Sequence, residues 1–250
     1  MTVTKRSSQG ASSVRGVLFD FYGTLARAVS WGDTHEAIFA RHGLHFDETQ
    51  WTDRWVGGTV DGEDHGHHSI SRDHYLAFEH ARLRSRVVAA GIDGVYCAAL
   101  VPDLYKASKD YTLAAYDEVA DELAGLRSAD VMVAICSNWD WDLDDAVASV
   151  GLSHLVDVTV TSAQAGARKP HPRIYNHTLE RCGLKPEQVL FVGDTWGPDV
   201  VGPLAAGMKA VHLYRNDRND HSNPQARPAL PPGSTRRPDL GGLARDLGFG

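Results

Sequence analysis

Residues 14–25 read Val-Arg-Gly-Val-Leu-Phe-Asp-Phe-Tyr-Gly-Thr-Leu, an apolar run that ends in the carboxylate of Asp20 and a glycine turn. The run lacks the alternation of a strand with one solvated face, so it predicts a strand buried on both faces. Ligand sites of α/β sheets lie at the carboxyl ends of such strands. Asp20 is therefore placed to act on a ligand. The alternative is that Asp20, Gly23 and Thr24 only form a strand-ending turn.

Other apolar runs alternate with helical patterns along the chain. The runs that predict further buried strands are residues 131–137, 156–160, 189–192 and 209–213. The helical patterns between them cover residues 115–127, 143–150, 172–182 and 198–206. Glycines at positions 151, 183 and 207 suit helix ends, and Pro172 suits a first helical position. This alternation predicts an α/β fold with a doubly wound, Rossmann-like parallel sheet.

About 110 residues separate Asp20 from Val131, far more than one crossover helix requires. Helical patterns at residues 34–42, 69–90 and 101–111 predict that a small helical cap is inserted there and returns to the core near residues 111–116. We expect a disordered leader at residues 1–13, a core formed by residues 14–28 and 112–250, and a helical cap at residues 29–111. Within the core, residues 216–237 predict a flexible loop and residues 239–247 a closing helix.

Composition excludes several classes of protein. The 250 residues carry a net charge of −7, which disfavours a nucleic-acid partner. The longest nearly apolar stretch, residues 87–101, is broken by Asp93 and is shorter than the ~20 residues of a membrane-spanning helix. Three cysteines without a Cys-x-x-Cys pair indicate a reducing compartment. We expect a cytoplasmic monomer or homodimer with a small-molecule substrate and no nucleic-acid or membrane partner.

Polar residues follow the other strands as well. Asp194 and Asp199 come after residues 189–192, and with Asp20 they offer three hard oxygen donors suited to Mg²⁺. The alternative for this pair is helix capping by Asp194. Ser137 and Asn138 follow residues 131–136 and predict a site for a phosphate or carboxylate oxygen, or else a simple turn. Lys169 precedes Pro170, which restricts its backbone; an isolated lysine is otherwise usually a solvated surface group.

Taken in order, Asp20, Ser137, Lys169, Asp194 and Asp199 resemble the four motifs of the haloacid dehalogenase superfamily of hydrolases, over residues 14–213. The resemblance implies that Asp20 is a nucleophile that forms a covalent intermediate, with Thr24 orienting it. It implies that Ser137 binds the transferring group and that Lys169 neutralises charge around Asp20 and the substrate. It also implies a Mg²⁺ site formed by Asp20, the carbonyl of Tyr22, Asp194 and Asp199. The insertion resembles the family's helical cap.

Tyr22 departs from the phosphatase pattern, which has a second Asp two residues after the nucleophile. A phenol, with an ordinary pKa near 10, is a poor general acid at neutral pH. The text Phe-Asp-Phe-Tyr-Gly-Thr-Leu also resembles the L-2-haloacid dehalogenase branch, in which halide leaves without a proton. That branch needs no metal and uses an arginine for the substrate carboxylate, for which Arg27 and Arg41 are candidates. The retained acidic pair, Asp194 and Asp199, favours a phosphatase.

Two other stretches leave alternatives open. Residues 61–68, Asp-Gly-Glu-Asp-His-Gly-His-His, predict a solvated cap loop, with zinc binding or a replacement acid over the site as the alternatives. Trp139, Asp140 and Trp141 line the pocket entrance or pack between core and cap.

The leading hypothesis is a Mg²⁺-dependent phosphatase that forms an aspartyl-phosphate at Asp20. The alternatives are a metal-independent haloacid dehalogenase and a catalytically weakened binding protein.

Overall fold

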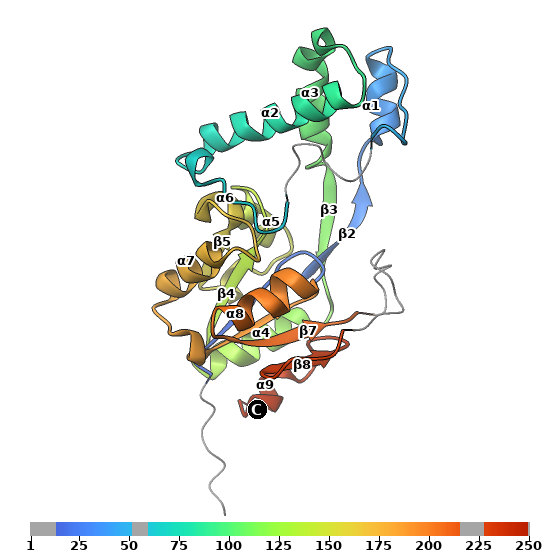
Figure 1. Ribbon diagram of the computed structural model, residues 1–250. Coiled ribbons are helices and arrows are strands. Elements are labelled where there is room, and N and C mark those ends of the chain that lie inside the picture. Colours follow the sequence, from blue (N-terminus) through green and yellow to red (C-terminus); the bar gives the residue numbers. More distant parts are fainter. Residues whose placement is uncertain (1–13, 52–59, 216–227, 250) are drawn as a thin grey trace, which may run out of the picture.

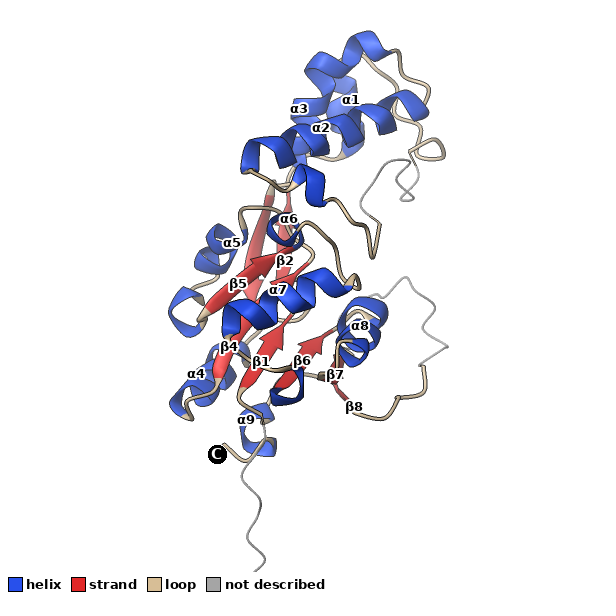
Figure 2. Ribbon diagram, turned by 60° about the vertical axis from the view of Figure 1, so that its left-hand side comes forward, coloured by secondary structure: helices blue, strands red, loops and turns tan. Residues whose placement is uncertain are grey.

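The computed structural model describes residues 14–51, 60–215 and 228–249, and its centre is a six-stranded sheet (Figures 1 and 2). All neighbouring strands pair in parallel. Their order across the sheet is β5 (Val158–Thr161), β4 (Met132–Ser137), β1 (Gly16–Phe19), β6 (Val189–Gly193), β7 (Lys209–Leu213) and β8 (Ser234–Arg237). The predicted doubly wound α/β fold is confirmed, and five of these strands lie where apolar runs predict them.

Helices cover both faces of the sheet (Figure 2). Val17 and Phe19 belong to one apolar cluster, to which α4 (Val119–Ser128), α5 (Leu143–Ser149) and α9 (Leu243–Asp246) contribute. Leu18 belongs to a second cluster with residues of α7 (Pro172–Cys182). Successive residues of β1 thus face two separate cores, which explains why the strand has no polar alternation.

The helix that follows β6 differs from the prediction. Residues 198–206 do not form one α-helix: a wide π-helical turn, η5 (Trp196–Val201), is followed by the short α8 (Gly202–Ala205). Pro203 lacks an N–H, so the ordinary bond to the carbonyl of Asp199 cannot form. In addition, the Tyr175 hydroxyl donates to the carbonyl of Pro198. By contrast, α7 has its predicted bounds, and the helix-ending Gly183 has a φ of 64°.

Three further helices lie between β1 and β4 in the sequence and together at the upper end of Figure 1. These are α1 (His35–Arg41), α2 (Arg72–Ala89) and α3 (Cys97–Ala107), and they share an apolar cluster of their own. The third helix begins and ends four residues before the predicted range of 101–111. It ends early because the chain turns there into a strand that the sequence did not predict.

That strand, β3 (Tyr111–Ala115), pairs antiparallel with β2 (Ala26–Trp31) in a two-stranded ribbon. The N–H of Gly32 also donates to the carbonyl of Asp110 at 2.7 Å. The chain therefore leaves for α1 and returns from α3 at adjacent points. The expected boundaries between core and cap, at residues 28/29 and 111/112, fall inside β2 and at the start of β3, and this division remains a prediction.

The C-terminal part also differs from expectation. Residues 234–237, placed in a flexible loop by the sequence, form β8 beside β7. This strand lies at the edge of the sheet, and its residues are exposed or half-buried. Its sequence, Ser-Thr-Arg-Arg, therefore lacks the apolar run that predicts a buried strand. The closing helix is limited to α9. Residues 216–227 and the expected leader, residues 1–13, lie outside the described residues.

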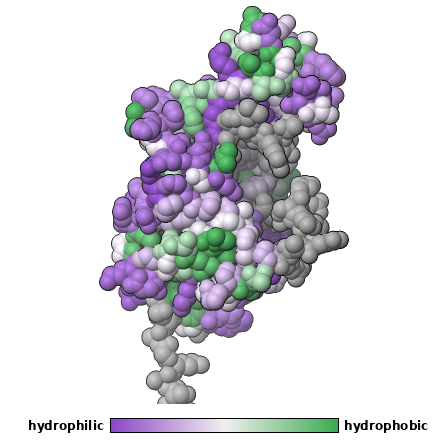
Figure 3. Space-filling view, viewed as in Figure 1, coloured by the Kyte–Doolittle hydropathy of each residue, from purple (hydrophilic) through white to green (hydrophobic). Residues whose placement is uncertain are grey.

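Hydrophilic residues cover most of the face shown in Figure 3, with an apolar patch in its lower half. Of the helices in the described residues, none has the length and apolarity to cross a membrane. Cys97, Cys136 and Cys182 are free and buried, as expected for packing residues.

Candidate active site

Two side chains meet where parallel strands end at one edge of the sheet. Asp20 directly follows β1, and its N–H donates to the carbonyl of Val192 in the neighbouring β6 at 2.9 Å. Ser137 ends β4 on the other side of β1, and its Oγ donates to Asp20 Oδ1 at 2.8 Å. Both side chains are buried. The strand-end argument from sequence thus places these residues correctly.

Lys169 is buried at 1% exposure and lies between two of the acids. Its Nζ donates to Asp20 Oδ1 at 2.8 Å and to Asp199 Oδ1 at 2.7 Å. Burial acts against the charged form, but the carboxylates of Asp199 and Asp20 outweigh it and raise the pKa of Lys169 above its ordinary value. The ammonium is therefore held charged beside Asp20.

Asn138 fixes the backbone that carries this lysine. Its Oδ1 accepts from the N–H of Lys169 at 2.6 Å, and its Nδ2 donates to the carbonyl of the same residue at 3.1 Å. The sequence predicts a substrate contact for Asn138, and that contact stays untested. What the structure adds is a positioning role for Lys169, which sequence reasoning missed because the two residues lie 31 positions apart.

Asp194 and Asp199 complete a cluster of three acids with Asp20. One carboxylate oxygen from each of Asp20, Asp194 and Asp199 lies within 4.8 Å of the others. Thr24 Oγ1 donates to Asp194 Oδ1 at 3.1 Å, and the positive φ of Gly23, 86°, allows the turn that brings Thr24 back to this point. Burial raises the pKa of Asp199, because its carboxylate has been removed from water.

The cluster fits a hard divalent cation. Oxygens on an octahedral Mg²⁺ at about 2.1 Å lie at most about 4.2 Å apart, so movements of less than about 1 Å would bring these carboxylates onto one ion. Ser137 and Lys169 both donate to Oδ1 of Asp20, so neither occupies its Oδ2. Among the described residues, no other group of three or more His, Cys, Asp or Glu side chains is arranged for a metal. Zinc binding by residues 61–68 therefore has no support.

Residues 60–68, the docking segment, are mostly exposed or half-exposed, as expected of a solvated loop, but their backbone also pairs with another part of the chain. They run along residues 166–170 beside the active-site lysine. Three backbone hydrogen bonds join the two stretches: Gly62 to Lys169 at 3.1 Å, His65 to Gly166 at 2.9 Å, and Arg168 to Glu63 at 2.9 Å. Arg173 also binds both oxygens of Asp64, at 2.7 and 2.8 Å. Because the paired stretches lie about 100 residues apart, no local sequence signal could have shown this contact.

Residues 139–140 connect the core to the helices above it. Trp139 packs edge-on against Phe21, with ring centroids 5.4 Å apart. Asp140 accepts from the Tyr75 hydroxyl of α2 at 3.2 Å and forms an ion pair with Lys109, just after α3. Asp140 thus joins the core to α2 and to the residues after α3, while the alternative that these residues line a pocket entrance stays a prediction.

The remaining candidates have other partners. Tyr22 is half-buried, and its ring packs against the apolar cluster that contains Phe19. The guanidinium of Arg27 lies 5.1 Å from the centre of the Tyr116 ring. Arg41 is exposed and forms an ion pair with Asp33. Neither of these two contacts involves Asp20.

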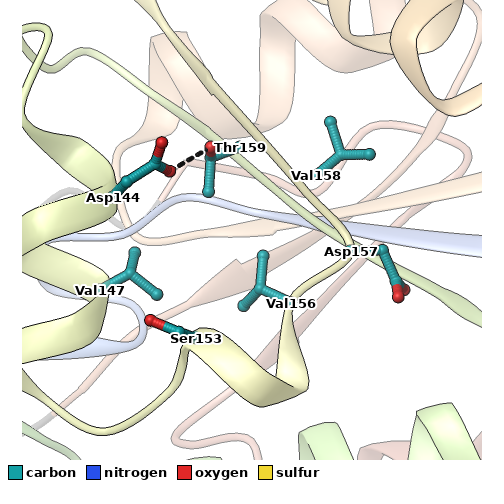
Figure 4. Close-up of a pocket in the computed structure, with 7 residues that line it drawn as sticks. All are labelled: Asp144, Val147, Ser153, Val156, Asp157, Val158 and Thr159. Carbon is teal, nitrogen blue, oxygen red and sulfur yellow. Dashed lines mark hydrogen bonds between the residues drawn. The ribbon is translucent and has the colours of Figure 1, made fainter.

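A pocket of about 210 Å³ lies on the side of the molecule formed by α5 and β5 (Figure 4). Thr159 Oγ1 donates to Asp144 Oδ1 there at 2.5 Å. All of its lining residues come from positions 144–159: Asp144, Val147, Ser153, Val156, Asp157, Val158 and Thr159. It contains none of the clustered acids, so it does not compete with the strand-end site as the candidate active site.

Several curated proteins are similar to part of this chain. Haloacid dehalogenase-like hydrolase domain-containing protein 3 of Homo sapiens is 34% identical over 121 residues, 48% of each chain. Phosphoserine phosphatase of Thermus thermophilus is 33% identical over 122 residues, also 48% of each. (S)-2-haloacid dehalogenase 4A of Burkholderia cepacia is 34% identical over 105 residues, 41% of this chain and 45% of that protein. The chain spans about half the length of the curated relatives it matches.

A solved structure shares the fold over nearly the whole chain. The crystal structure of a dehalogenase with an intermediate complex matches with a TM-score of 0.58 and 22% identity, covering 95% of this chain and 98% of the other. The sequence model of the haloacid dehalogenase-like hydrolase family matches residues 14–207. This range includes Asp20, Ser137, Lys169, Asp194 and Asp199. The chain therefore belongs to the haloacid dehalogenase-like hydrolase family.

Proposed function

We propose that this hydrolase is a Mg²⁺-dependent phosphatase that acts on a small phosphorylated metabolite through a phosphorylated Asp20. The cluster of Asp20, Asp194 and Asp199 carries the proposal. An anionic nucleophile approaches an anionic phosphoryl group only when cations offset the repulsion. Displacing halide from carbon gives such a cluster no evident use.

The proposed reaction has two steps. An oxygen of Asp20 attacks phosphorus, and the bond from phosphorus to the leaving oxygen breaks with its electron pair, which then takes up a proton. Water next attacks the phosphoryl group on Asp20, releasing phosphate and restoring the carboxylate. Ser137 and Lys169, which both contact Asp20 Oδ1, hold the transferring group and balance its charge.

Asp20, Asp194, Asp199 and the carbonyl of Tyr22 would hold the proposed ion. When bound, Mg²⁺ would neutralise charge that develops on the phosphoryl oxygens. Thr24 orients Asp194 through its hydrogen bond, and Asn138 keeps the Lys169 backbone in place. These positioning contacts support a site that is formed before substrate arrives.

We also infer that residues 29–111 act as a cap that selects the substrate. The docking segment and the contacts of Asp140 with Tyr75 and Lys109 support this, because they bring α2 and α3 against the active-site loops. The free cysteines are compatible with a reducing compartment, and we place the enzyme in the cytoplasm.

A phosphate-ester screen with Mg²⁺ or with EDTA tests the proposal. We expect phosphate release only with the metal. Asp20→Asn should lower the rate by at least about 10³-fold, because it removes the nucleophile. Asp144→Asn, which changes an exposed acid of the α5 pocket, is the matched control and should retain full activity. Metal-independent turnover would exclude the proposal.

A haloacid dehalogenase is the second candidate, favoured by Tyr22 in the position of the usual second Asp. It would release chloride from 2-chloropropionate in the presence of EDTA, and Asp20→Asn would abolish that release. A catalytically weakened binding protein would instead show stabilisation by ligand with no Asp20-dependent turnover of either substrate class.

A further inference from the structure

His212 contacts the loop that carries two of the clustered acids. It lies in β7, the strand beside β6, and is 5% exposed. Its Nε2 lies 3.1 Å from the carbonyl oxygen of Asp194. A carbonyl only accepts, so Nε2 carries the proton of this hydrogen bond.

Arg236 determines which ring nitrogen carries that proton. From β8, its Nε donates to Nδ1 of His212 at 3.2 Å. An arginine Nε–H can only donate, so Nδ1 is the unprotonated acceptor and the neutral ring keeps its hydrogen on Nε2. The neighbouring strands β7 and β8 thus fix the tautomer in which His212 donates to the carbonyl of Asp194.

The peptide group that His212 contacts also binds Asp199. Its carbonyl belongs to Asp194, and its N–H belongs to Thr195, which donates to Asp199 Oδ2 at 2.8 Å. Carbonyl and N–H point in opposite directions across a planar peptide group. By fixing the carbonyl, His212 therefore aims the N–H at the Asp199 carboxylate, whose other oxygen is bound by Lys169.

We propose that His212 is a positioning residue for the cation site: through the Asp194–Thr195 peptide group it holds Asp199 in the geometry that binds the metal, with Arg236 fixing its tautomer. The inference rests on the proposed Mg²⁺ site. Both residues lie beyond residue 207, where the match to the family model ends.

Two substitutions at position 212 separate a positioning role from mere packing. His212→Leu removes the donor to Asp194, whereas His212→Gln places an amide N–H near the position of Nε2 and restores it. His154→Leu, at an exposed histidine, is the control for the change of residue type. The measurement is Mn²⁺ binding followed by electron paramagnetic resonance, with Mg²⁺ as competitor, together with the melting temperature without metal.

We expect His212→Leu to weaken Mn²⁺ binding about 10- to 100-fold, the usual effect of losing a partner that orients a metal ligand, while His212→Gln and His154→Leu bind nearly as the wild type does. Equal binding by a folded His212→Leu variant would overturn the inference, as would equal losses in the Leu and Gln variants. Absence of Mg²⁺-competed binding in the wild type would overturn the proposed function itself.

If His212→Leu does not fold, nitrogen-15 spectra of the wild-type histidine side chains carry the test. His212 should appear as the neutral tautomer protonated on Nε2, and Arg236→Met should reduce both this preference and the affinity for Mn²⁺. A wild-type ring protonated on Nδ1, or unchanged Mn²⁺ affinity in Arg236→Met, would overturn the assignment.

Discussion

Tyr22 stands two residues after Asp20, where a carboxyl group would protonate a leaving alkoxide better near neutral pH. We predict that Tyr22→Asp accelerates the cleavage of alkyl phosphates by about 10²- to 10⁴-fold, the usual gain from general acid–base help. The gain should be small for p-nitrophenyl phosphate, because nitrophenolate leaves without a proton. Steady-state kcat on the two substrates measures the effect.

Tyr22→Phe is the control for this substitution, since it removes only the hydroxyl. If the phenol takes no part in proton transfer, kcat on alkyl phosphates should not change. A large loss in Tyr22→Phe, or no gain in Tyr22→Asp, would show that the tyrosine already serves the reaction.

Single residues were predictable where local sequence sets their position. Asp20, Ser137 and Asp194 each end or follow an apolar run, and parallel strands bring such ends to one edge. The contacts that hold these residues in place could not be predicted in the same way. Nothing near Asn138 in the sequence indicates its two bonds to the Lys169 backbone, and nothing near His212 indicates its contact with Asp194. A lone histidine inside the apolar run of β7 was the available signal.

At the scale of elements, the end of β6 and the π-helical turn η5 are packed very closely. A Cβ atom added to Gly193 would lie 2.4 Å from Cγ of Asp199, closer than real Cβ contacts allow. We predict that Gly193→Ala displaces Asp199, lowers the melting temperature and weakens metal-dependent activity. Gly197→Ala is the matched control in the same turn, because its Cβ would meet no atom within 4 Å. Equal effects of the two changes would contradict this account.

We expect the ring of His65 to make the stability of the docking segment depend on pH. Burial lowers the pKa of this ring, although Glu63 opposes the shift. The unfolded chain, with an ordinary pKa near 6.5, therefore binds the proton more tightly than the folded one. The stability that neutral His65 contributes is present above about pH 6.5 and is lost as pH falls towards the folded-state pKa.

We predict that amide exchange in the docking segment becomes faster as pH is lowered below about 6.5, after correction for the intrinsic exchange rate. His65→Phe should remove this pH dependence, because its ring packs against Tyr75 and Phe78 as His65 does but takes up no proton. His154→Phe, at an exposed position, should not. The same pH profile in wild type and His65→Phe would show that another group controls the segment.

Which elements were predictable follows from their burial. Central strands such as β1 and β6 are apolar throughout because helices cover both faces. The ribbon β2–β3 and the edge strand β8 are largely exposed or half-exposed, so their sequences carry little apolar signal. Their pairing depends on partners distant in sequence, which local patterns do not encode.

For the whole molecule, the adjacency of Gly32 and Asp110 predicts that the intervening insertion can be removed. We expect a chain in which residues 33–109 are replaced by Asn-Gly to keep the parallel sheet, since a two-residue turn joins antiparallel strands well. The groups of the insertion that bind Asp140 are polar, so water can take their place. Cooperative thermal unfolding by circular dichroism, together with retained Mn²⁺ binding, would support the proposed division of the chain.

Asp194→Asn in the shortened chain is the control, and it should abolish Mn²⁺ binding without changing the unfolding transition. A shortened chain that unfolds gradually, or that exposes apolar surface to a fluorescent dye, would show instead that the helices are needed for the core to form.

The position of β1 determines how the enzyme loses its activity when it unfolds. The strand that delivers Asp20 is flanked by β4 and β6 and buried on both faces, and elements of this kind open only when the whole structure does. Heating or urea should consequently leave no population that is still folded yet has lost its nucleophile. Residual catalysis in a partly denatured sample would then report the fraction of native molecules directly, and slow inactivation on storage would track the rate of global unfolding.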